Sequence, residues 1–170
     1  MTPNEVDSAE SIRKGHVPGV QAAALRKLEH ELGIVPGAVP PLKFMTRVYY
    51  WARDEATYGE HAPWGEHEID CILLSKLDCK GADFSFQPHP EEIRDTKWVT
   101  YEELKQMMND PELTFSPWFK LIANKFLYEW WGRSASALDE TMVSNQACDF
   151  TTIHKLMDPP ANMKVGSRAR

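Results

Sequence analysis

The run Trp64-Gly65-Glu66-His67-Glu68-Ile69-Asp70 constrains the fold more than any other part of the sequence. It leads directly into the apolar stretch Cys71-Ile72-Leu73-Leu74. The composition predicts a strand over residues 66–75, and a nearly continuous apolar tail is typical of a strand covered on both faces. Because alternate residues of a strand share a face, Glu66, Glu68 and Asp70 are expected on one side, with Cα atoms about 6.6–7 Å apart.

These three carboxylates are candidate ligands for a divalent ion, since hard oxygen ligands suit Mg²⁺ or Mn²⁺. The alternative is an acidic strand end that faces water. Against that alternative stands the free-energy cost of placing unpaired carboxylates beside an apolar core segment. The same alternation predicts that His67 points away from Glu66 and Glu68, so it is not a candidate ligand.

The remaining elements follow from periodicity and end signals. Residues 1–18 are polar, and we expect them to be irregular. The predicted elements are a helix over 20–32 ending at Gly33, strands over 44–51 and 93–99, a helix from Thr100 to about residue 109, and a buried helix from Ser116 to Gly132. This order indicates an α/β layered domain with a mixed sheet.

Composition sets the class of protein. The chain has 170 residues, 42% hydrophobic and 26% charged, which fits one globular domain. Its net charge of −6 argues against nucleic-acid binding through bulk positive charge. No apolar run reaches the ~20 residues of a membrane span, and the N-terminus lacks signal-peptide features. Three cysteines without CxxC spacing indicate a reducing compartment, so cytoplasmic location is expected, and the oligomeric state is open.

A second candidate site is the pair Lys27 and Glu31, four residues apart on the first long helix. Such pairs are often ordinary surface ion pairs. The functional interpretation is that Glu31 holds Mg²⁺ against a phosphate group while Lys27 supports it.

Four blocks carry a resemblance to a known family: Ala23–Ile34, Thr46–Tyr50, Trp64–Asp70 and Ser116–Ile122. In this order they resemble type I isopentenyl-diphosphate isomerase, an enzyme of isoprenoid synthesis with a Nudix-type fold. The resemblance implies a Nudix-like mixed sheet sandwiched by helices over residues 19–156. It leaves a polar segment over 1–18 and a basic tail over 157–170, for which no role is predicted.

The resemblance also implies a reaction and the residues that perform it. The family interconverts isopentenyl diphosphate and dimethylallyl diphosphate, through protonation of the alkene to a tertiary carbocation and loss of a neighbouring proton. Glu68 matches the catalytic glutamate, which also binds the first metal ion, and Glu66 matches a second ligand of that ion. Tyr50 matches the tyrosine that works with this glutamate in proton transfer.

Three further positions match residues that surround the substrate. Trp118 matches the tryptophan whose face lies near the carbocation. Glu31 matches the carboxylate of the diphosphate-bound Mg²⁺, and Lys27 falls where relatives often carry an arginine near the diphosphate. The protein-bound ion could be Mg²⁺, Mn²⁺ or Zn²⁺, and the partner would be a small allylic or homoallylic diphosphate.

The sequence also departs from the family. It contains no Cys-Ser-His-Pro-like block, which carries the family's catalytic cysteine, and Cys71, Cys79 and Cys148 do not replace it. We therefore expect a truncated C-terminal portion that lacks N-terminal strands, leaves the edge beside the second strand uncovered, and has weak or no activity alone. The loop over 52–63 is longer than in relatives, which leaves open whether Tyr50 reaches the site.

Two other functions remain open. A Nudix hydrolase acting on nucleoside diphosphate derivatives would retain Arg26, Glu31 and Gly33, but Lys27 and His30 occupy two carboxylate positions of the hydrolase motif. The other alternative is a non-catalytic interaction module, an inactive paralogue that keeps the scaffold.

Overall fold

The computed structural model describes residues 7–53, 59, 63–77, 84–132 and 134–156. Its helices and strands follow one another in this order: α1 (Ala9–Arg13), α2 (Pro18–Leu32), the 3₁₀ turn η2 (Pro36–Ala38), β1 (Lys43–Arg53), β2 (Gly65–Leu74), α4 (Tyr101–Met107), α5 (Pro117–Ile122), the π-helix η4 (Ala123–Leu127), α6 (Tyr128–Trp131), α7 (Ala135–Val143) and β3 (Ile153–Lys155).

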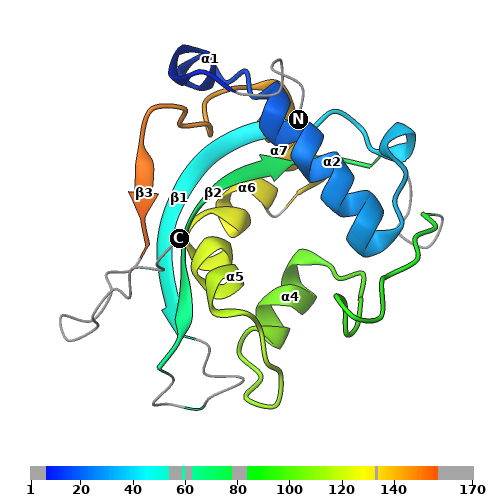
Figure 1. Cartoon of the computed structure of the whole chain (residues 1–170). Helices are drawn as coiled ribbons and strands as arrows, with labels where there is room; N and C mark the ends of the chain where they lie inside the picture. Colours follow the sequence, from blue (N-terminus) through cyan, green and yellow to red (C-terminus); the bar gives the residue numbers. More distant parts are fainter. Residues whose placement is uncertain (1–6, 54–58, 60–62, 78–83, 133, 157–170) are drawn as a thin grey trace.

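The strands form a mixed sheet in the order β2-β1-β3, in which β1 pairs antiparallel with β2 and parallel with β3. Figure 1 shows β1 and β2 curving around α5 and α6. The core lies between these layers, where Val48, Tyr50 and Ala52 of β1 pack with Ile122 of α5. The predicted α/β class with a mixed sheet is confirmed.

The second strand is less covered than its sequence predicts. Residues 65–69 are exposed, Ile69 to 57%, and the rest of β2 is only half-buried. The reason is topological, because in the described part of the chain β2 is an edge strand that pairs only with β1. The expectation of cover on both faces was therefore wrong, whereas the expected open edge beside this strand is observed within the described residues.

Two other expectations about elements were also wrong. Residues 93–99 form no strand, because their chain finds no strand partner and Thr96, Lys97 and Trp98 instead line a cavity beside α2. Residues 9–13 form a helix rather than an irregular segment, and the Ser8 hydroxyl caps it by accepting from the Ser11 N–H.

The two helix-end signals in the sequence behave as predicted. Gly33 ends α2 in the left-handed conformation, with φ of 65°, and its N–H donates to the Glu29 carbonyl oxygen. Thr100 and Glu103 form the predicted capping box at the start of α4, where the Thr100 N–H donates to a Glu103 carboxylate oxygen at 2.7 Å.

The long apolar helix exists from residue 117 to residue 131, but it is not a uniform α-helix. Its middle turn, η4, is π-helical, and Gly132 ends the segment with φ of 66°. Ile122, Ala123 and Trp130 are buried and hold this helix against the sheet. The tail over 157–170 and Cys79 lie outside the described residues.

Candidate functional site

The site begins at β1, whose Tyr50 ring is buried to 3% exposure in the core. In the antiparallel register Tyr50 lies opposite Glu68, Val48 opposite Asp70 and Ala52 opposite Glu66. Opposite residues of paired strands project to the same face. The three carboxylates of β2 therefore lie on the sheet face that carries the core of β1, which is the face that α5 covers.

The Tyr50 hydroxyl group lies among these carboxylates. It donates a hydrogen bond to the Glu66 Oε2 at 3.3 Å. Burial raises the pKa of Tyr50 well above its usual value, and the negative charges of Asp70, Glu66 and Glu68 raise it further. Tyr50 thus stays protonated and acts as a hydrogen-bond donor to a carboxylate.

Asp70 is the one acid of the three that is partly buried rather than exposed. Burial raises its pKa first, followed by the charges of Glu68 and Glu66, and a hydrogen bond from Tyr50 opposes the shift. The resemblance gave Asp70 no role, although its place two residues after Glu68 was the signal that it shares this face. The charges of Glu66 and Glu68 affect Asp70 because the three carboxylates share one face of β2.

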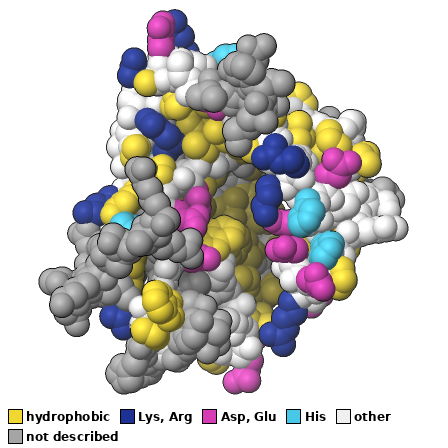
Figure 2. Space-filling model, in the orientation of Figure 1, with side chains coloured by type: hydrophobic (Ala, Val, Ile, Leu, Met, Phe, Trp, Pro, Cys, Tyr) yellow, Lys and Arg dark blue, Asp and Glu magenta, His cyan; other side chains and the backbone are white. Residues whose placement is uncertain are grey.

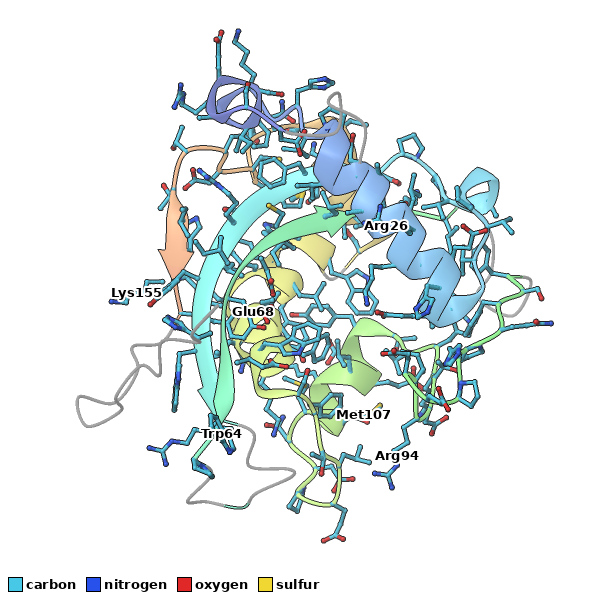
Figure 3. The ribbon with its side chains drawn as sticks, in the orientation of Figure 1. Arg26, Trp64, Glu68, Arg94, Met107 and Lys155 are labelled. Atoms are coloured by element: carbon cyan, nitrogen blue, oxygen red, sulfur yellow. The ribbon has the colours of Figure 1, made fainter. Side chains whose placement is uncertain are left out.

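His67 lies on the opposite face of the sheet, as strand alternation predicts. Its Nε2 is hydrogen-bonded to the Tyr49 hydroxyl, and the two rings meet edge to face with centroids 5.0 Å apart. Figure 3 shows Glu68 on the side of β2 toward α5 and Lys155 projecting from the far side of the sheet.

Trp118 lies in the first turn of α5. It precedes Leu121 and Ile122 by three and four residues, so all three side chains share one helix face. Because Leu121 and Ile122 pack on the core of β1, that face is the one toward the sheet. The indole is 36% exposed and meets the Phe119 ring edge to face, with centroids 6.0 Å apart.

Lys27 and Glu31 form an ion pair on α2, with side chains 64% and 28% exposed. The hydrogen bond and charge of Glu31 raise the pKa of Lys27. Figure 2 shows a hollow with an apolar floor between two polar borders, one acidic and one of mixed Lys, Arg, acidic and His side chains. By the arrangement in Figure 1, these borders correspond to β2 and α2.

The border at α2 also contains residues to which the sequence assigned no role. His30 stacks on His89, with ring centroids 5.5 Å apart. The His89 N–H donates to the Glu31 carbonyl oxygen at 2.7 Å, which fastens the segment after β2 to the end of α2. No local pattern around His89 predicts this contact, because it depends on tertiary packing.

The donor set suits a divalent cation, although it is incomplete. Glu66, Glu68 and Asp70 supply hard oxygen atoms, and a cation would relieve their mutual repulsion. Among the described residues, however, no three His, Cys, Asp or Glu side chains are arranged to hold one ion together. The two described cysteines are half-buried, and burial raises the pKa of both Cys71 and Cys148, so neither is a reactive thiolate.

The NUDIX domain family model matches residues 9–119, more than half of the chain, and the protein therefore belongs to the Nudix family. Several curated relatives of the chain are named as isomerases. The chain is 47% identical over 126 residues to isopentenyl-diphosphate delta-isomerase IDI1 of Gibberella zeae, a match that covers 73% of this chain and 46% of that protein.

Two further relatives carry the same name. Isopentenyl-diphosphate delta-isomerase of Schizosaccharomyces pombe is 42% identical over 131 residues, 75% of this chain and 52% of the relative. Isopentenyl-diphosphate Delta-isomerase 1 of Bos taurus is 37% identical over 159 residues, 91% of this chain and 60% of the relative. The resemblance to this isomerase family is confirmed, and the matched part spans about half the length of most of these relatives.

The helices also bear on whether the chain crosses a membrane. Within the described ranges, none of them combines the length and the apolar character needed to cross a lipid bilayer.

Proposed function

We propose that this chain carries the carboxylate half of an isopentenyl-diphosphate isomerase site. The observation that carries the proposal is the buried Tyr50 hydroxyl, which donates to Glu66 while Glu68 lies opposite on the same face. The names of the relatives supply the isomerisation of isopentenyl diphosphate, and the resemblance implies dimethylallyl diphosphate as its product.

In this proposal Glu68 exchanges the proton with the substrate carbon, and Tyr50, held protonated, works with it from the opposite position on β1 while donating to Glu66. Moving the double bond requires one group to add a proton at the terminal alkene carbon and another to remove a proton from the CH₂ group on the other side of the resulting cationic carbon. Glu68 and Tyr50 serve one face of the substrate. The opposite face would need the cysteine that this sequence does not contain.

Trp118 would place its π-face toward the developing positive charge, an interaction worth about 2 kcal/mol when water is excluded. Lys27 and Glu31 would hold the diphosphate end at the α2 border of the hollow. Glu66 and Glu68 would hold one divalent ion, Mg²⁺ or alternatively Mn²⁺ or Zn²⁺, and Glu31 would hold a separate Mg²⁺ that neutralises charge on the diphosphate. Cytoplasmic location belongs to the same proposal.

The alternative function is that of a Nudix hydrolase, which the structure supports less well than the isomerase. Lys27 stands at a position where the hydrolase motif has a carboxylate, and its ammonium group is paired with Glu31. This arrangement leaves α2 with fewer free acids for metal binding than a hydrolase needs.

The test uses the chain with isopentenyl diphosphate and Mg²⁺ in D₂O, with deuterium incorporation followed by NMR. We expect turnover far below that of a complete enzyme. Joining to this chain the part of the Bos taurus relative that the alignment does not cover should restore turnover, and Glu68→Gln in that chimera should lower it by about 10²–10⁴-fold. Glu102→Gln on exposed α4 is the matched control.

Three outcomes would overturn the proposal. They are turnover that survives Glu68→Gln in the chimera, an inactive chimera that is nevertheless folded, and release of phosphate in place of isomerisation. Turnover by the unaltered chain at the rate of a complete enzyme would contradict the expectation that the chain alone has weak or no activity.

A further inference from the structure

A cavity of about 280 Å³ lies beside α2, apart from the candidate site. Leu28 and Leu32 of α2 form one wall, and Phe84, Phe86 and Trp98 of the segment after β2 form another. The candidate site residues Lys27, Glu31, Tyr50, Glu66, Glu68 and Trp118 do not line it. The cavity therefore has no part in the proposed isomerase chemistry.

The aromatic wall is built from three rings that contact one another. Trp98 meets Phe86 and Phe84 edge to face, with ring centroids 6.0 and 6.4 Å apart. Trp98 is nevertheless 52% exposed. A large indole that is fixed by two neighbours and still open to solvent is a surface on which an apolar ligand gains burial.

The polar groups of the lining restrict the class of ligand. The Ser75 hydroxyl already donates to the Pro40 carbonyl oxygen at 3.2 Å. Among the described lining residues this leaves Thr96 and Lys97 as polar side chains, and Lys97 is the cation. An apolar cavity with a lysine among its walls complements a molecule with an apolar chain and an anionic head.

The volume limits the length of that chain. At about 30 Å³ for each water-sized group, the 280 Å³ cavity accepts about nine non-hydrogen atoms. This size lies at the lower limit for small-molecule sites, which favours a short chain.

We propose that this cavity binds an anionic amphiphile whose chain of about eight to ten carbons lies between α2 and Trp98, with its head at Lys97. The charge could be a carboxylate or a diphosphate, and the chain could be linear or branched. The proposal stands independently of the isomerase activity, because it concerns binding at other residues.

The experiment is calorimetric titration of the full chain in EDTA, so that no divalent ion holds a diphosphate at the candidate site. The probes are alkanoates of six to twelve carbons, geranyl diphosphate and uncharged geraniol. We expect one molecule per chain, and an affinity that rises about fourfold for each added methylene until the cavity is full. Geranyl diphosphate and the alkanoates then distinguish the two head groups.

Three variants locate the binding. Leu28→Trp fills the cavity and should abolish binding. Lys97→Gln should weaken the anionic probes about two- to fivefold, as expected for a partly exposed charge pair, and leave geraniol unchanged. A ligand beside Trp98 should also change the tryptophan fluorescence of the chain. Trp98→Phe should remove this change while the calorimetric signal persists.

Two control variants test whether the probes bind in the cavity or elsewhere on the surface. Lys105→Gln, on the exposed side of α4, and Glu68→Gln, at the candidate site, should both bind like the parent chain. The proposal is overturned if affinity does not depend on chain length, if Lys97→Gln and Lys105→Gln have equal effects, or if no probe binds. Should Leu28→Trp fail to fold, the Lys97 and Trp98 variants decide the question.

Discussion

Among single residues, Asp70 gives the clearest prediction about pH. Its pKa is higher in the folded chain than in the unfolded chain, so ionisation costs more in the folded state. The stability linked to its protonated form is fully present below the unfolded pKa of about 3.9 and is lost as pH rises through the folded pKa. Asp70→Asn should therefore stabilise the chain at pH 7 by about 0.5 kcal/mol and have little effect at pH 3.

Urea unfolding at the two pH values measures this difference, with Glu112→Gln, an exposed acid away from the site, as the control. A destabilising effect of Asp70→Asn at neutral pH would show that the carboxylate is needed for folding, contrary to the expectation.

Glu66 and Glu68 should bind a divalent ion in the isolated chain. Titration with Mn²⁺, followed by electron paramagnetic resonance, should show binding that Glu66→Gln or Glu68→Gln weakens by about tenfold or more. The ion should raise the melting temperature, and EDTA should reverse the increase. Equal Mn²⁺ binding by both variants, the parent and the Glu102→Gln control would place the metal elsewhere.

The residue scale is where sequence reasoning reached furthest. Strand alternation alone placed Glu66, Glu68 and Asp70 on one face and His67 on the other, because a period of two leaves no freedom once the strand exists. The contact of His89 with Glu31 could not be predicted from the sequence, because it joins two distant segments through tertiary packing that no local pattern encodes. The roles of the site residues stay predictions.

Among the elements, α2 depends on how it ends. Gly33 has φ of 65°, and a Cβ built there would lie 2.9 Å from the Gln87 carbonyl oxygen. Gly33→Ala should lower the free energy of unfolding by about 1–2 kcal/mol or more, from the left-handed backbone and the close contact together. Gly37→Ala is the matched control, because no atom lies within 4 Å of its Cβ position.

Urea denaturation of both variants tests this expectation. Equal stability of Gly33→Ala and Gly37→Ala would mean that the turn after α2 can rearrange freely, and that the contact with Gln87 does not hold the helix end.

The predictions of helices were correct where the sequence contains a capping or C-terminal glycine signal. The prediction of a strand that used composition alone was wrong. The capping box and Gly33 were predicted because their hydrogen-bonding groups are local. The strand over residues 93–99 was not formed, because an extended segment becomes a strand only if another strand pairs with it. The prediction that β2 is covered on both faces was wrong for the same reason, because such cover depends on neighbours that are distant in sequence.

For the whole molecule, the sheet order predicts a gradient of protection. In the described sheet β1 lies between β2 and β3, whereas β2 pairs on one side. Amide hydrogen exchange should therefore be slow at Arg47–Tyr49 of β1, which pair on both sides, and fast at alternate residues of β2, where N–H groups point away from β1. Equal protection of both strands would show that further chain or a partner covers the β2 edge.

The π-helical turn between α5 and α6 has a consequence for how such a site can vary. A π turn accommodates one residue more than an α turn, and one residue corresponds to about 100° of rotation. Loss of a single residue within Ala123–Leu127 would thus convert the π turn into an α turn and leave Trp118 and Trp130 on their present sides of the helix. A one-residue deletion at this turn would therefore shorten the segment without turning the indole away from the sheet.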